Sequence, residues 1–281
     1  MVRPVESSAG WQADLDLAFA RRGEQTVLSG NRHRGPLQVQ KALYPEGKEV
    51  CHLAILHPPG GVAAGDCLGV RAALGDQSRA LLTTPGAAKW YRSEAAWATQ
   101  HMHFSLGERA SLEWLPRENI FFNGAKVSLE LEVDLSEHAQ YCGWDIFSFG
   151  RSASGEVWRR GKLHMRTRIR CLDRVLWSEI ANVDAQSGFA DSAVGLAGFA
   201  VCGTLLFAGF EVGGALLAQC RDVRRPPADS RVGVTCVPHV LIARYMGTSC
   251  EAAFEWFTNL WAILRQAGLG KAAHIPRLWA C

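Results

Sequence analysis

The chain has 281 residues, and its 30 Lys and Arg residues nearly balance its 27 Asp and Glu residues, so the formal net charge is +3. This balance argues against nucleic-acid binding as the main role, because a phosphate-binding surface shows as clustered excess Lys and Arg. Apolar residues make up 48% and charged residues 20%, which is typical of a globular chain rather than a disordered one. We expect residues 1–281 to form a single domain.

Half-buried β-strands are predicted where apolar and polar residues alternate. The alternation covers residues 11–19, 127–135 and 162–171. Shorter runs compatible with strands, separated by Gly, Pro or Asp, lie at residues 50–56, 79–83, 110–115, 141–149 and 174–180. From these patterns alone we expect a mostly antiparallel β domain.

Helix signals appear late in the chain. Thr248 and Glu251 have the spacing of a capping box, and apolar residues behind them fall on one helical face. Gly268 offers a stop for this helix. A shorter helix is predicted near residues 214–223, followed by a solvated loop at 224–230.

An uncharged stretch, residues 192–210, approaches the length that a membrane span needs. It contains four glycines and lacks flanking Lys and Arg asymmetry, so we interpret it as a pair of buried strands joined by glycine turns. We therefore expect no membrane association.

Cysteine usage indicates the cellular compartment. No two of the nine cysteines have CxxC spacing, which excludes a zinc ribbon or a thioredoxin-like motif. The first ten residues contain no apolar signal core. Free thiols in a cytoplasmic protein are the expected outcome.

The densest motif is the loop His57, Pro58, Pro59, Gly60 and Gly61. Its prolines stiffen the backbone and its glycines allow positive φ angles. Such a loop can bring backbone amides close to another chain or an ion. A tight turn between strands is the alternative that the loop alone favours.

A second loop places Lys89, Tyr91 and Arg92 within a short polar and aromatic segment. A phosphate site uses basic turns of this kind. The alternative, favoured from the residues alone, is a loop whose aromatic rings pack while its cations reach solvent.

His101 and His103 are two residues apart, so on a strand they share a face and have the geometry of a metal-binding pair. Two ligands alone make a poor site, which favours solvated histidines. Carboxylates among aromatic residues are a separate signal, because a buried carboxylate is costly unless it is paired or hydrated. These carboxylates are Glu113, Glu118, Asp145 and Glu179.

No catalytic motif is visible in the sequence. It contains no GxSxG elbow and no HExxH helix. A hydrolase using a cysteine or a metal-bound water remains a rival hypothesis, and it predicts a reactive thiol or a tightly bound metal. The chain is not expected to be an enzyme.

Taken together, short strings in register along nearly the whole chain resemble one family, the urease accessory protein UreD, also called UreH. Each string alone is weak, but so many in order are specific. The strings are GWQADL (10–15), HRGPL (33–37), YPEG (44–47), CH (51–52), HPPGG (57–61), GD (65–66), TTPGA (83–87), KWYRS (89–93), LEWLP (112–116), GWDI (143–146), GR (150–151), GE (155–156) and PRLWA (276–280).

This resemblance implies a fold and a role. The fold is mainly β: one sheet-rich, β-helical domain of antiparallel and mixed strands with about two α-helices towards the C-terminus. Proteins of this family form a complex with UreF and the GTPase UreG, bind apo-urease and help deliver Ni²⁺ to its active site. UreG, not the UreD-like chain, hydrolyses GTP. No tightly bound cofactor is expected, and Ni²⁺ would be held only transiently.

A nickel passage needs oxygen or nitrogen ligands that hold the ion weakly and release it. We predict that Asp66, Asp145 and Glu179 line such a passage. Their alternative role is hydrogen bonding to buried backbone. His101 and His103 are predicted as weaker, transient metal contacts, and the two loops described above as partner surfaces. A pure scaffold that joins UreF and UreG to urease without contacting nickel is the alternative function.

Overall fold

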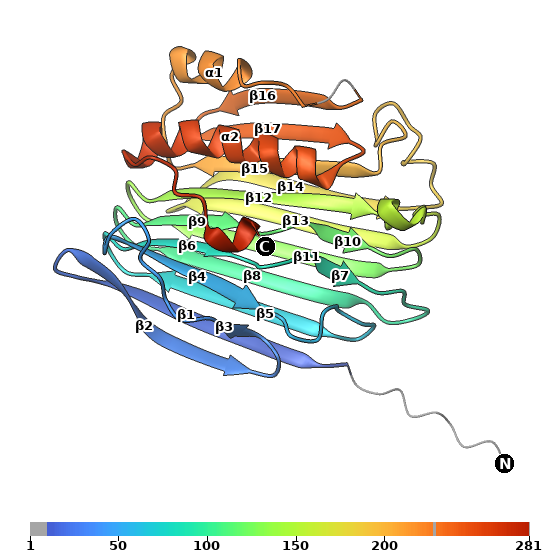
Figure 1. Cartoon of the computed structure of the whole chain (residues 1–281), viewed down its shortest axis with the longest axis horizontal. Helices are drawn as coiled ribbons and strands as arrows, with labels where there is room; N and C mark the ends of the chain where they lie inside the picture. The colour runs from blue at the N-terminus through green and yellow to red at the C-terminus, as the bar shows by residue number, and fades with distance from the viewer. Residues whose placement is uncertain (1–9, 227–228, 281) are drawn as a thin grey trace.

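Two β-sheets face one another in the computed structural model, which describes residues 10–226 and 229–280 (Figure 1). We call the first the open sheet. It comprises, in spatial order, β14 (Arg174–Asp184), β13 (Lys162–Cys171), β11 (Lys126–Leu135), β8 (Ala98–Leu106), β5 (Cys67–Leu74), β1 (Gln12–Arg22) and β2 (Gln25–Arg34).

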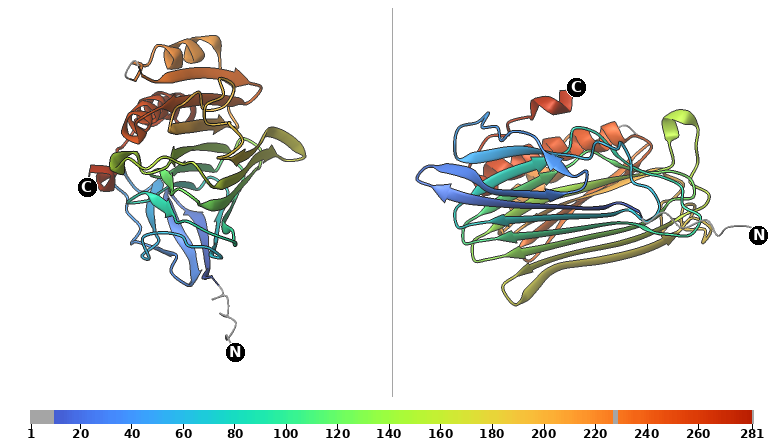
Figure 2. Two further views of the ribbon diagram at one scale, coloured as in Figure 1. Left: turned by 90° about the vertical axis from the view of Figure 1, so that its right-hand side faces the viewer. Right: turned by 90° about the horizontal axis from the view of Figure 1, so that it is seen from below.

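The second, which we call the covered sheet, lies beneath the long C-terminal helix (Figure 2). Its main path runs through β16 (Arg231–Val237), β17 (Val240–Gly247), β15 (Val201–Ala208), β12 (Gln140–Phe149), β9 (Ser111–Leu115), β6 (Arg79–Thr83), β4 (Val50–Leu56) and β3 (Gln38–Val39). Two short strands, β10 (Asn119–Phe121) and β7 (Ala88–Trp90), branch from β12.

The chain coils between the sheets, and each turn adds one strand to each of them. Strands β5, β8, β11 and β13 pair in parallel in the open sheet, as do β4, β6, β9 and β12 in the covered sheet. The expected β-helical, sheet-rich fold is therefore confirmed. The expectation from residue patterns of mostly antiparallel pairing is wrong, because a coil returns each strand to its sheet in the same direction.

Burial patterns follow from what covers each sheet. Strands of the open sheet alternate buried and accessible residues, as β1 does, because one face meets the core and the other meets solvent. In the covered sheet β9 is buried throughout, since apolar residues contact the facing sheet on one side and helix α2 on the other. Sequence alternation is therefore clearest for the open sheet.

Helix α2 (Cys250–Leu269) packs on β12, β15 and β17, and the short α1 (Gly214–Arg221) lies beside it. Ser249 caps α2, since its hydroxyl accepts from the N–H of Ala252 at 3.1 Å, so the predicted Thr248 cap is one residue early. The helix also passes the predicted stop at Gly268 and ends at Gly270, whose φ of 65° terminates it in the left-handed region. Two 3₁₀ turns complete the helical elements, at Ser152–Ser154 and Arg277–Ala280.

The uncharged stretch at residues 192–210 forms one strand, β15, preceded by turns, so the predicted strand pair is wrong. Within the described ranges, no helix is long and apolar enough to cross a membrane. Every cysteine in these ranges is a free thiol, as expected. The predicted loop at 224–230 lies partly outside the described residues, at 227–228.

Candidate functional site: a cavity between the two sheets

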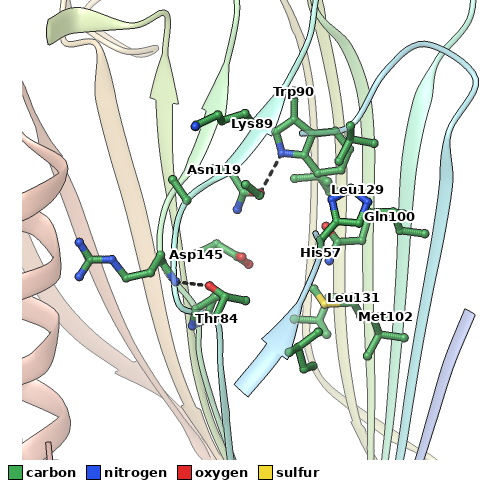
Figure 3. Close-up of a pocket in the computed structure, with 18 of the residues that line it drawn as sticks. His57, Thr84, Lys89, Trp90, Gln100, Met102, Asn119, Leu129, Leu131 and Asp145 are labelled. Carbon is green, nitrogen blue, oxygen red and sulfur yellow. Dashed lines mark hydrogen bonds between the residues drawn. The ribbon is translucent and has the colours of Figure 1, made fainter. Parts of the chain in front are cut away.

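A cavity of about 320 Å³ lies between the open sheet and the covered sheet (Figure 3). Strands β5, β8, β11 and β13 form one wall and β9 and β12 the other, while the loops after β4 and β6 contribute one end. Most of the lining is apolar. Its polar and charged residues are His57, Thr84, Lys89, Gln100, Arg117, Asn119, Glu130, Asp145, Arg166 and Thr167.

Asp145 is placed in this cavity by the two-residue period of β12. Its strand neighbours Tyr141 and Phe147 point into the core between the sheets, whereas Trp144 and Ile146 point toward α2. Of residues 141–149 in β12, Asp145 alone is partly accessible, because its side chain faces the cavity. Figure 3 shows its carboxyl group facing the wall formed by the open sheet.

The Asp145 carboxylate has no hydrogen-bond donor among the described residues. Burial, and then the nearby carboxylate of Glu179, raise its pKa from 3.8 to about 7. A carboxyl group with this pKa exchanges a proton near neutral pH, and its charged form is stabilised by any cation that enters the cavity.

A second space, a narrow segment of about 20 Å³, adjoins the cavity and has room for about one water molecule. The two spaces share Leu131, Asp145, Phe147, Met165 and Thr167 as lining residues. Glu179, on β14 of the open sheet, lines the narrow segment beside Thr204 of the covered sheet. Asp145 therefore lines both spaces, whereas Glu179 lines only the narrow segment.

Glu179 differs from Asp145 in having a cationic partner. Its Oε1 accepts a hydrogen bond of 2.8 Å from Nη1 of Arg244 on β17. The sequence contained no signal for this pairing, because β14 and β17 belong to different sheets and the two residues are 65 positions apart.

An indole donor also lacks a partner beside this cavity. Trp114 on β9 lines the cavity, and its Nε1–H is buried without a hydrogen bond among the described residues. By contrast, Trp90 donates to Oδ1 of Asn119 at 2.9 Å. An unpaired buried donor and an unpaired carboxylate in one space indicate that it holds water or a hydrated ligand.

Asp66 has a different setting from the other two predicted passage residues. One of its carboxylate oxygens accepts from the backbone N–H of Trp11 at 2.8 Å, and the other from that of Ala63 at 2.7 Å. Both oxygens are thus used in closing the turn before β5 and in holding the start of β1. The structure brings Asp145 and Glu179 together along one space, whereas Asp66 is not among the lining residues.

The two loops predicted as partner surfaces lie side by side. The backbone of Val62, next to the loop His57 to Gly61, donates to the carbonyl of Lys89 at 2.7 Å and accepts from the N–H of Tyr91 at 2.9 Å. Pro58, Pro59 and Gly60 are exposed, as are Lys89, Tyr91 and Arg92. The two loops therefore present one continuous exposed edge.

Gly61 is required where these loops meet, since a Cβ at this position would overlap the ring of Tyr91. That ring packs edge-on against Phe122 with centroids 5.0 Å apart. His57 lines the cavity, and burial lowers the pKa of its imidazole, an effect that nearby Asp66 opposes. His57 is thereby biased to the neutral form, which is able to bind a metal.

His101 and His103 lie on the outer face of the open sheet, away from the cavity. Each pairs with a carboxylate of the neighbouring strand β11, His101 with Glu130 at 3.2 Å and His103 with Asp134 at 2.7 Å. Within the described ranges no group of three or more His, Cys, Asp or Glu side chains has the geometry of a metal site. The predicted transient contact is thus placed on a surface separate from the passage residues.

A buried ionic cluster holds helix α2 on the covered sheet. Arg265 of α2 is almost wholly buried, and its guanidinium donates to Glu113 at 2.9 Å and to Glu46 at 2.6 Å. Trp261 also donates to Glu113, at 2.6 Å, and His52 contacts Glu46 at the same distance. Glu113, a buried carboxylate noted in the sequence, is therefore paired and serves to position the helix.

Known proteins resemble this chain in sequence over nearly its whole length. A family model described as UreD urease accessory protein matches residues 12–280. The chain is 50% identical over 278 residues to the urease accessory protein UreD of Dechloromonas aromatica (strain RCB), which covers 98% of this chain and 96% of that protein. It is 48% identical over 271 residues to that of Azoarcus sp. (strain BH72), covering 96% and 94%. For that of Ralstonia nicotianae the identity is 45% over 283 residues, covering 98% and 96%.

Proposed function

The chain belongs to the UreD family of urease accessory proteins, and from this premise we propose that it acts in urease maturation by helping to deliver Ni²⁺ to apo-urease. It does so as a cytoplasmic component of a complex with UreF and UreG. The chain itself catalyses no reaction, and Ni²⁺ is its cargo rather than a resident cofactor.

The observation that carries this proposal is the unpartnered carboxylate of Asp145 in a cavity between the two sheets. A divalent cation entering that space finds a carboxylate that has no hydrogen-bond or ion-pair partner among the described residues, together with room for its remaining water ligands. One carboxylate with water holds such an ion weakly, whereas a cluster of three or four protein ligands would trap it.

The route that we propose for Ni²⁺ past Asp145 has its two ends in different parts of the fold. The wide end lies at the loops that contain Gly61 and Thr84, and the narrow end reaches Glu179. Ni²⁺ passing between them meets Asp145 and Glu179 in turn. His57 lines the wide end as a neutral imidazole, a ligand type that Ni²⁺ accepts.

The exposed edge formed by Pro58 to Gly60 and Lys89 to Arg92 lies at the wide end of the cavity. In this proposal it is a docking surface for a partner of the complex, so that nickel enters or leaves without contacting competing ligands. Asp66 supports this edge by fixing the turn behind it.

A pure scaffold role would use the same surfaces without nickel passing through the chain. The open carboxylate of Asp145 favours the passage, because a scaffold gains nothing from burying an unpaired acid. The two functions differ in what happens when Asp145 is neutralised and the complex still forms.

Complementation tests the proposed function. Cells that lack the native protein, but produce urease, UreF and UreG of the same organism, are supplied with this chain. We expect active, nickel-containing urease, with UreF, UreG and urease co-purifying with the tagged chain. Inactive urease despite a well-expressed, folded chain would contradict the proposal.

A further inference from the structure

Arg244 joins the two sheets at the narrow end of the cavity. Its Nη1 donates to Glu179 Oε1 on the open sheet at 2.8 Å and to Thr204 Oγ1 on the covered sheet at 2.7 Å. Glu179 and Thr204 both line the narrow segment. The guanidinium is therefore hydrogen-bonded to two polar side chains that line the narrow segment, Glu179 and Thr204.

Cross-strand register aligns this cation with Asp145. Asp145 on β12 lies opposite Thr204 on β15, and Thr204 lies opposite Arg244 on β17. All three side chains point toward the open sheet, since alternate residues of β17, Val240 and Ile242, also belong to the core between the sheets. With strands about 4.8 Å apart, the backbone of Arg244 is about 10 Å from that of Asp145.

We infer that Arg244 is an electrostatic latch that closes the narrow end of the nickel passage. In the closed arrangement seen here its guanidinium neutralises Glu179 and places a positive charge at the exit. When the side chain turns away, Glu179 becomes a free carboxylate ligand. This inference rests on the proposed function, and it adds how that passage is regulated.

The energetics suit a latch. The side chains of Arg244 and Glu179 are 45% and 21% exposed, so the ion pair is partly hydrated and contributes little to stability. Turning the guanidinium away also breaks its hydrogen bond to Thr204 and its contact with the Trp177 ring, whose centroid lies 5.8 Å from Cζ, so the latch opens against these two contacts as well. A divalent cation within several ångströms of the guanidinium is repelled more strongly, because the repulsion scales with the product of the charges.

Arg151 is a matched control for this latch. It forms an ion pair with Glu156, Nε to Oε2 at 3.1 Å, with exposed fractions of 48% and 21%, and neither residue lines the cavity or the narrow segment. Arg151→Gln removes the same charge at similar exposure without opening the cavity. Arg244→Lys keeps the charge but replaces the guanidinium with an ammonium group.

The test is titration of the purified full-length chain with Ni²⁺ alone, with folding of each variant checked by circular dichroism. Arg244→Gln is expected to bind Ni²⁺ about tenfold more tightly than wild type, since a nearby positive charge is removed and Glu179 is freed. Arg151→Gln and Arg244→Lys are expected to bind close to wild type. Adding Glu179→Gln to Arg244→Gln should remove most of the gain. Equal affinities for Arg244→Gln and Arg151→Gln would overturn the latch.

A second readout separates the latch from the passage itself. Nickel loading of urease is measured in cells that carry Asp145→Asn or Arg244→Gln. If Asp145→Asn lowers loading while Arg244→Gln binds Ni²⁺ as wild type does, the passage stands and the latch is overturned. If Asp145→Asn loads urease normally, the passage that the latch would close is overturned too.

Discussion

Asp145 and Glu179 come from opposite sheets, yet they lie close enough for the carboxylate of Glu179 to raise the pKa of the Asp145 carboxyl group. Glu179 has Arg244 as a partner and Asp145 has none among the described residues. Two acids that share a narrow space with only one cation leave a local negative charge. That charge strengthens proton binding by Asp145, which agrees with the raised pKa of its carboxyl group.

The pH dependence of stability tests this setting of Asp145. Its pKa is raised from 3.8 to about 7 in the folded chain, so the folded state keeps a proton that the unfolded chain releases at lower pH. The contribution of Asp145 to stability is therefore fully present below about pH 4 and is lost as pH rises through about 7. Asp145→Asn avoids that loss.

We expect Asp145→Asn to become more stable than wild type, by on the order of 1–3 kcal/mol, as pH rises from about 5 to about 8. Urea unfolding of both proteins at the two pH values measures the difference. A difference between the proteins that stays constant across this range would contradict the raised pKa.

Asp66 is predicted to act through the fold rather than through nickel. Asp66→Asn replaces one acceptor oxygen with an NH₂ group, which cannot accept a hydrogen bond. The side chain can then no longer accept from both the Trp11 and the Ala63 backbone amides. The expected loss of stability is about 1–2 kcal/mol. Urease activation should fall only in proportion to the amount of folded chain. Loss of activation at full folded yield would instead support the passage role predicted from sequence.

Gly61 tests the exposed edge at the wide end of the cavity. Gly61→Ala is expected to push the Tyr91 ring aside, to cost about 1 kcal/mol of stability and to weaken co-purification of partner proteins. Gly86→Ala is the matched control in the next loop, because a Cβ there meets nothing within 4 Å. Equal partner recovery with both variants would argue against this edge as a docking surface.

The buried cluster at Arg265 is predicted to hold α2 in place. Arg265→Met leaves Glu113 and Glu46 without their guanidinium partner, which should reduce stability by about 3–5 kcal/mol. Arg160→Met is an exposed control that should change little. Guanidinium chloride unfolding measures both variants, and a loss below about 1 kcal/mol for Arg265→Met would contradict the assigned role.

Sequence patterns predicted the strands well where one face meets solvent. The predicted strand at residues 162–171 coincides with β13, because Leu163, Thr167 and Ile169 alternate with charged residues. Pairing direction was not predictable in this way, since alternation reports which face is buried and not which strand is adjacent. Likewise Ser249 and Thr248 are both suitable caps by type, and only the backbone angles of Ser249 decide between them.

The candidate site was predictable only in part. Asp145 and Glu179 were identifiable as acids near aromatic residues, Asp145 within the string GWDI and Glu179 two residues after Trp177. Arg244 and Thr204 gave no signal, because they join the site through cross-strand register between segments far apart in the chain. Asp66 belongs to a similar string, yet its role is set by two backbone amides that a sequence cannot place.

The most direct test of the passage is the nickel content of urease purified from cells that carry Asp145→Asn, measured per urease subunit, with recovery of the accessory complex quantified alongside. Asp173→Asn, in the exposed turn between β13 and β14, serves as the control. We predict that Asp145→Asn assembles normally but lowers the nickel content several-fold, while Asp173→Asn has no effect. Wild-type nickel content with Asp145→Asn would contradict the passage and leave the scaffold role as the account of this chain.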